Sequence, residues 1–113
     1  MMSKVILVLS NFPAADDAGA AKRAAKALVK EGLAACVNLI PGVTSVYSWK
    51  GRLEEDSETT ALIKTTFERY AELEVRLKEL HPYETPEIIA IPIEAGSAEY
   101  LKWVRGSVKD EAE

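Results

Sequence analysis

Residues 33–66 decide the fold, and they read LAACVNLIPGVTSVYSWKGRLEEDSETTALIKTT. Two strand-like segments flank the short glycine-containing stretch Lys50-Gly51-Arg52, which predicts a β-hairpin. Ordinary strands contain about 5–6 residues, but the piece from Val43 to Lys50 alone would extend roughly 26 Å. Pro41-Gly42 interrupts the first strand. Because proline cannot donate to a strand ladder, this pair predicts a bulge or a bend.

The outer half of this hairpin requires a partner. Val43, Tyr47 and Trp49 fall on one face of the first strand, and the returning strand begins with acidic residues before it becomes apolar at residues 61–63. A domain of this size has no core that covers so long an arm. Since natural proteins pair, cover or charge a long strand edge, the hairpin is predicted to pair with another copy of the chain.

The composition is that of a single globular domain, residues 1–113, with a charged tail at 109–113 that we expect to fray. Hydrophobic residues make up 48% of the chain and charged residues 28%, which argues against disorder. A net charge of −4 gives no basic surface for nucleic acid. No apolar run reaches the roughly 18 residues of a membrane span. The chain has a single cysteine, and its first apolar run suits a strand better than a secretory leader peptide. Both observations favour the cytoplasm.

The remaining elements follow from periodicity and end signals. Residues 4–9 form an apolar strand that Asn11-Phe12-Pro13 ends, and Asp16-Asp17 open a helix that closes at Gly32. The apolar stripe of that helix comprises Ala21, Ala24, Ala25 and Leu28. The second strand begins at Leu33.

A second helix is predicted after the hairpin. Thr65 and Glu68 fit a capping box, and His81-Pro82 ends the helix. Its apolar stripe comprises Phe67, Tyr70, Leu73, Leu77 and Leu80. Residues 87–93 then form a strand in which Pro92 indicates an edge or an end, and Ser97 caps a last helix that Gly106 weakens.

The order strand, helix, strand, strand, helix, strand, helix predicts an α+β fold of the ferredoxin-like, split βαβ kind. It has one antiparallel sheet with helices on a single face. The other face of the sheet then lacks a cover, and oligomerisation would supply one.

Five sequence blocks carry a resemblance to a known family. They are residues 34–51 (AACVNLIPGVTSVYSWKG), 53–55 (LEE), 63–65 (IKT), 81–88 (HPYETPEI) and 100–103 (YLKW). In order and spacing they resemble the divalent-cation tolerance family, CutA. The resemblance implies a tight homotrimer that pairs strands across subunits through the long hairpin, in the cytoplasm, linked to copper and other divalent metals. The architecture is also similar to PII-type signalling trimers, which bind small effectors in clefts between subunits.

His81 is the only histidine and the first candidate metal ligand, with Glu84 as a neighbouring donor. The alternative is that His81 ends a helix and hydrogen-bonds locally. Some family members place a cysteine at the end of the first strand and a second histidine beside the one in the His-Pro-Tyr motif. Here those positions hold Ser10 and Leu80, which removes two soft donors. We therefore expect weak binding, with copper first, and no metal required for folding.

Other residues have a functional and a structural interpretation. Cys36 is predicted to be a core residue rather than a ligand. The acidic side chains of the returning strand are interpreted as a solubilising face rather than a site for calcium or magnesium; they are Glu54, Glu55, Asp56 and Glu58.

The aromatic residues are predicted to lie in the trimer interface rather than in a ligand cleft; they are Tyr47, Trp49 and Trp103. Lys64, Tyr83 and Glu87 are candidates for a cleft between subunits, although an ion pair between Lys64 and an acidic neighbour explains that lysine equally well.

Enzymatic functions find no support in the motifs. The loop after the first strand, Ser10-Asn11-Phe12-Pro13, lacks the arginine of an acylphosphatase, and no phosphate-binding or dinucleotide glycine motif occurs. RNA-recognition domains place aromatic residues on their third strand, where this chain has residues 53–58, LEEDSE. The sequence predicts a non-enzymatic homotrimer that binds divalent cations, with a PII-like sensor and a structural trimer that docks another protein as alternatives.

Overall fold

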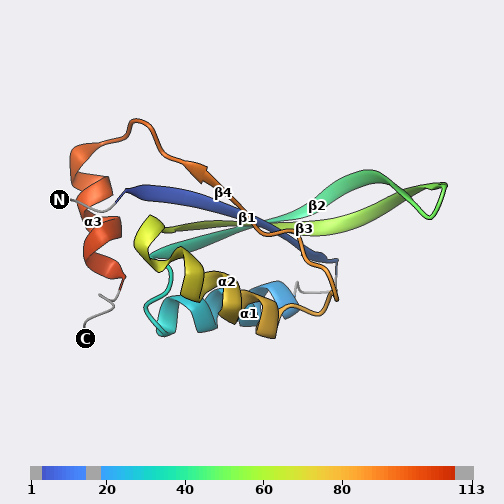
Figure 1. Ribbon diagram of the computed structural model, residues 1–113, viewed down its shortest axis with the longest axis horizontal. Coiled ribbons are helices and arrows are strands. Elements are labelled where there is room, and N and C mark those ends of the chain that lie inside the picture. The colour runs from blue at the N-terminus through green and yellow to red at the C-terminus, as the bar shows by residue number, and fades with distance from the viewer. Residues whose placement is uncertain (1–3, 15–18, 109–113) are drawn as a thin grey trace.

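The computed structural model describes residues 4–14 and 19–108, and Figure 1 shows its arrangement. The elements are β1 (Val5–Pro13), α1 (Gly19–Lys30), β2 (Cys36–Trp49), β3 (Arg52–Thr66), the 3-10 turn η1 (Phe67–Arg69), α2 (Tyr70–Leu80), β4 (Ile89–Pro92) and α3 (Ala98–Ser107).

The four strands form one antiparallel sheet in the order β2-β3-β1-β4. Helices α1 and α2 lie together on one face of it, and α3 stands at the end opposite the hairpin tip (Figure 1). This order, with its crossover between β1 and β3, confirms the predicted ferredoxin-like α+β fold with one additional helix.

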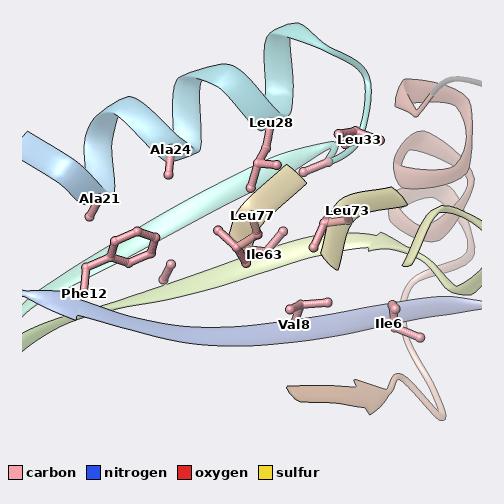
Figure 2. Packing of buried hydrophobic residues seen from close by; sticks show 12 residues of the cluster. Ile6, Val8, Phe12, Ala21, Ala24, Leu28, Leu33, Ile63, Leu73 and Leu77 are labelled. Carbon is pink, nitrogen blue, oxygen red and sulfur yellow. The ribbon is translucent and has the colours of Figure 1, made fainter. Parts of the chain in front are cut away.

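The core lies between the sheet and the two helices (Figure 2). Small residues on α1 bring that helix close to the strands, because Ala21 and Ala24 are fully buried and add little height above the sheet. Leu73 and Leu77 fill the space under α2 against Ile63. The prediction of an alanine-rich packing stripe is therefore confirmed at residues 21, 24 and 28.

The hairpin is built as the sequence predicts. Trp49 pairs with Arg52, so Lys50 and Gly51 form a two-residue turn, and both have positive φ, +50° and +77°. Two positive φ values define a type I′ turn, whose twist matches that of the flanking strands. The strand register shifts between Ile40 and Val43, and Gly42 takes φ +72°, which confirms the predicted bulge.

The face of the sheet away from α1 and α2 carries six apolar side chains, which we call the open face; they are Leu7, Leu9, Ile40, Leu62, Ile89 and Ile91. By the same strand register, Asn38, Thr60 and Lys64 lie on this side of the sheet as well. Ile89 and Ile91 are 48% and 43% exposed. Among the described residues, the end of this face near α3 is covered, because Val104 packs there on Val5 and Ala35. A patch of this kind marks an interaction surface.

Three strand boundaries differ from the predicted ones. Strand β1 continues through Pro13, because Asn11 to Pro13 pair with β3 instead of leaving the sheet. Strand β2 begins at Cys36, since residues 33–35 form a buried connection to α1. Strand β4 contains only Ile89–Pro92, with Pro92 at its end and the strand at the sheet edge, as the proline predicted.

The predicted capping box at Thr65 is wrong. Thr65 is still in β3, and its hydroxyl donates to the Leu33 carbonyl at 2.7 Å, so tertiary pairing takes the group that a cap would use. Thr66 precedes η1 without a side-chain cap. Phe67 is 67% exposed and does not belong to the buried stripe, because the 3-10 turn rotates it away from the core.

Cys36 was predicted to be a core residue, and this prediction is wrong. It is half-buried, and the pleat directs it to the same side as Lys64, its partner across β2 and β3. Ser97 does cap α3, accepting from the Tyr100 amide, and Gly106 lies inside that helix. The predictions for Asp16-Asp17 and for the tail at 109–113 fall outside the described residues.

Candidate functional site

A set of polar side chains gathers where β1 ends, at the point where the hairpin leaves the sheet. We call it the strand-end network; its members are Asn11, Glu58, Thr60, His81, Tyr83 and Glu87. Asn11 is its centre. The Asn11 amide group donates to Glu87 at 2.9 Å, and its side-chain oxygen accepts from Thr60 at 2.6 Å. The network joins β1, β3 and the connector after α2.

His81 is held in one tautomer by two backbone groups. Its Nδ1 faces the Tyr83 amide at 3.1 Å, and its Nε2 faces the Asn11 carbonyl at 2.8 Å. An amide can only donate and a carbonyl can only accept, so Nδ1 carries the lone pair and Nε2 the proton. The ring is 7% exposed and stacks on Phe12 with centroids 4.2 Å apart.

This environment favours neutral histidine. Burial lowers the pKa of His81 from its ordinary value of 6.5, while the Asn11 carbonyl and the Glu58 charge act in the opposite direction. A neutral imidazole with Nε2–H donated to a backbone carbonyl is the state in which histidine binds metals. In the present arrangement the Nδ1 lone pair is occupied by the Tyr83 amide.

Two tyrosine–carboxylate pairs occur in this region, and Tyr83 of the first pair contacts the His81 ring, with centroids 4.9 Å apart. The Tyr83 hydroxyl donates to Glu58 at 2.7 Å. The pKa of Tyr83 is raised, mainly by burial and next by this hydrogen bond. Tyr47 donates to Asp56, and this bond is the largest cause that raises the pKa of Tyr47 to about 12. Glu58 is therefore a buried network member, whereas the predicted solubilising role suits Glu54, Glu55 and Asp56, which are more exposed.

Glu84 lines a surface pocket of about 430 Å³ between α2 and the connector, together with Glu74 and Lys78. Within residues 4–14 and 19–108, no three His, Cys, Asp or Glu side chains form a group able to hold a metal ion. A complete metal site would therefore need donors beyond those that one chain brings together here.

The three predicted cleft residues separate into two places. Tyr83 and Glu87 belong to the strand-end network, whereas Lys64 lies six residues along β3 from Glu58, roughly 20 Å away in a strand. The Lys64 amine donates to Asn38 and lies 3.8 Å from the Cys36 sulfur. No ion pair to Lys64 occurs in the described part of the chain, so the alternative of an acidic partner stays a prediction.

The aromatic residues predicted for an interface lie at opposite ends of a molecule that measures 47 × 26 × 23 Å. Trp49 is at the hairpin tip, 59% exposed, with Lys50 over its ring at 5.8 Å. Trp103 is on α3, 50% exposed, and packs on Tyr100 with centroids 5.7 Å apart (Figure 1 shows both regions). One chain does not bring Trp49 and Trp103 together.

Sequence reasoning missed Asn11 and underrated Glu58. Their partners lie far along the chain: Asn11 contacts residues 49 to 76 positions away, and Glu58 contacts Tyr83 25 positions away. No local sequence pattern predicts contacts between residues so far apart along the chain. The available signal was the strand order, which places the end of β1 beside the connector after α2.

Comparison with known proteins identifies the class and then the family. The fold is the ferredoxin-like α+β sheet of solved divalent-cation tolerance proteins. The family model of the CutA1 divalent ion tolerance protein matches residues 6–107. The chain belongs to this divalent-cation tolerance family, as its sequence blocks predicted.

Individual relatives agree with this assignment. The divalent-cation tolerance protein CutA of Thermus thermophilus is 54% identical over 85 residues, covering 75% of this chain and 82% of that protein. That of Pectobacterium atrosepticum is 44% identical over 104 residues and covers 92% of each. Human protein CutA is 52% identical over 85 residues, which is 75% of this chain but 48% of the human protein, so the match spans about half of that longer relative.

Solved structures match over nearly the whole chain. The Thermus thermophilus divalent cation tolerance protein superposes with a TM-score of 0.87 at 47% identity, covering 93% of this chain and 99% of that one. CutA1 from Oryza sativa gives a TM-score of 0.91 at 37% identity, covering 97% and 98%.

Relatives occur in several compartments. One from Arabidopsis thaliana is described as chloroplastic, and one structure, from Archaeoglobus fulgidus, as periplasmic. Among the described residues of the present chain, the helices are too short or too polar to cross a membrane.

Proposed function

We propose that this chain acts as a homotrimer in which three copies complete one another's sheets. The observation that carries the proposal is the open face, six apolar side chains on a sheet side that α1 and α2 do not cover. The projecting hairpin, with Trp49 exposed at its tip, supplies the reach for strand pairing with a neighbour. In a closed assembly, the tip of one copy would pack near α3 and Trp103 of another.

The trimer would bind divalent cations weakly, copper foremost, through Nδ1 of His81 and a carboxylate oxygen of Glu84. The hydrogen bond from Nε2 to the Asn11 carbonyl supports this, because it fixes the tautomer that leaves Nδ1 as the donor. A metal would have to replace the Tyr83 amide and draw Glu84 in from its pocket. That competition, and the absence of a three-donor group in the described residues, agree with weak binding.

The role is proposed to be non-enzymatic and cytoplasmic. The family is described by ion tolerance rather than by a reaction. The polar groups beside His81 are also engaged with one another instead of being directed at an open cavity.

Copper titration by calorimetry tests the metal assignment. His81→Gln removes the donor, and we expect its copper affinity to fall about tenfold or more. Because His81 is buried, the surface variant Glu84→Gln gives a second measurement that cannot fail through misfolding, and Glu94→Gln is its matched control. Identical binding by wild type, His81→Gln and Glu84→Gln would show that neither residue is a ligand.

Light scattering tests the assembly separately. At micromolar concentration the chain should have the mass of three copies, and the mass of a single copy would contradict the proposal.

A second candidate is a PII-like sensor whose intersubunit cleft holds a small ligand among Lys64, Tyr83 and Glu87. The strand-end network supports it, because Tyr83 and Glu87 both belong to that network. Native mass spectrometry of the purified assembly should then reveal bound organic mass that Tyr83→Phe reduces. A trimer that carries no extra mass and ignores added effectors would exclude this candidate.

A further inference from the structure

Cys36, the first residue of β2, and Lys64, near the end of β3, are held together across these two strands, on the same side of the sheet as Leu7 of the open face. They are direct partners in the β2–β3 register, and the Ala35 amide bonds the Lys64 carbonyl at 2.8 Å. The Lys64 Nζ lies 3.8 Å from the Cys36 Sγ. Paired strands fix this proximity, because directly opposed side chains have their Cβ atoms about 5 Å apart.

Asn38 holds the Lys64 amine near the Cys36 thiol. Its side-chain oxygen accepts a hydrogen bond from the Lys64 Nζ, and the same oxygen lies 4.0 Å from the Cys36 Sγ. Asn38 is two residues from Cys36 along β2 and therefore on the same side of the sheet. Cys36 is the single cysteine of the chain, and the described residues place no carboxylate on Lys64. The nearest reaction partner of the thiol is thus an amine.

We propose that Cys36 and Lys64 form an oxidation-dependent covalent bridge, Nζ–O–Sγ, with dioxygen as the oxidant. The neutral amine and the thiol each lose one hydrogen, and one oxygen atom is inserted between nitrogen and sulfur. The second oxygen atom leaves as water with those two hydrogens. Nitrogen and sulfur each give up two electrons, and dioxygen accepts four. Because an oxygen atom lies between them, nitrogen and sulfur stay farther apart in this bridge than in a direct S–N bond.

The bridge would fasten the start of β2 to the end of β3, inside the sheet and roughly 20 Å along β3 from the point where the hairpin leaves it. It closes the loop formed by residues 36–64, so it restricts the unfolded chain and opposes separation of the two strands. Reduction by a thiol would release it, which makes this strand pair a redox-responsive position. Its oxidant is a small molecule, so the reaction does not depend on the function proposed above.

Intact-protein mass spectrometry tests the bridge on the full chain in its native assembly, before and after incubation in aerated buffer. The bridge adds one oxygen and removes two hydrogens, a gain of about 14 Da. Trypsin should then fail to cleave after Lys64, and the digest should contain one linked species joining the peptide with Cys36 to the peptide with Lys64. Dithiothreitol should restore the original mass.

Matched variants identify the atoms. Cys36→Ser and Lys64→Arg should abolish the gain, whereas Lys102→Arg, a change on α3, should leave it unchanged. Asn38→Asp should slow the reaction and move its onset to higher pH, because a carboxylate pairs with the protonated amine and an ammonium has no lone pair to react. A shift of the reaction's onset to higher pH would show that Asn38 positions the amine, because the loss of a merely structural contact would not change the pH dependence.

Several results would overturn the proposal. They are an unchanged mass after oxidation, a gain of about 32 Da from a sulfinic acid with normal cleavage after Lys64, a loss of about 2 Da from a direct S–N bond, and the same gain in Lys64→Arg.

Discussion

The base of the molecule and its projecting hairpin differ in how far their apolar side chains are buried. In the base, α1 and α2 cover one face of the sheet, and Val8, Leu73, Leu77 and Val104 are fully buried. In the outer hairpin, Trp49 is 59% and Leu53 81% exposed, although the two strands pair without interruption from Val43 to the turn. The base has a buried core of its own. The outer hairpin has regular backbone pairing, but Trp49 and Leu53 have no covering partner in the part of the chain that the structure describes.

This contrast shows that backbone hydrogen bonding and side-chain burial are separate in the arm, where paired strands carry exposed apolar side chains. Backbone pairing fixes the geometry of the arm, while the apolar side chains on it remain available. If the arm is an assembly element, changes in the base should alter folding and changes in the arm should alter association.

The largest effect is expected in the base. Leu77→Ala removes a fully buried side chain under α2 and should lower the free energy of unfolding by about 2–5 kcal/mol. Val75→Ala, an exposed site on the same helix, is the matched control and should change it by less than about 0.5 kcal/mol. Chemical denaturation measures both. Equal effects of the two variants would mean that packing under α2 does not dominate the stability of the base.

The next effect concerns the arm. Trp49→Glu should weaken association by about 2 kcal/mol or more per contact, because exposed tryptophans at interfaces are typical hot spots. Light scattering should show a lower mass, with the far-ultraviolet circular dichroism unchanged. Ser48→Glu adds the same charge on the opposite side of the strand and serves as control. An unchanged mass for Trp49→Glu would remove the hairpin tip from the interface.

The junction between the two regions should respond to pH through His81. Its pKa is lowered by burial in the folded state, so between that value and the ordinary value near 6.5 the unfolded chain binds more protons. Stability should therefore be complete above about pH 6.5 and fall below it, by at most about 1.4 kcal/mol per pH unit. Denaturation curves across this range measure the slope. His81→Gln should flatten it, and an equal slope in that variant would assign the effect to carboxylates.

The smallest effect lies at the tip. Lys50 holds a positive φ of +50°, which asparagine tolerates better than lysine. Lys50→Asn should raise the free energy of unfolding by about 0.5–1 kcal/mol in a thermal melt. If the arm orders only on association, the gain should appear as tighter assembly with the monomer's stability unchanged.

Local signals predicted much of this fold. Lys50-Gly51 gave the turn, Pro41-Gly42 the bulge, and His81-Pro82 the end of α2, each from a backbone restriction that is local by nature. Where tertiary contacts competed, local reasoning failed. Thr65 fits a capping box in the sequence, but it lies in β3 and its hydroxyl donates to the Leu33 carbonyl. Cys36 was predicted to be a core residue, but the pleat of the strand places it beside Lys64.

By itself, the sequence determined the order of elements, the long hairpin and the family, because turns, periodicity and contiguous blocks are properties of neighbouring residues. Only the tertiary structure decided which polar groups meet. Asn11 joins His81, Thr60 and Glu87, Tyr83 reaches Glu58, and Lys64 stands beside Cys36 instead of joining the predicted cleft. Those contacts depend on strand register and chain crossover, which connect residues too distant in sequence for any local pattern to encode.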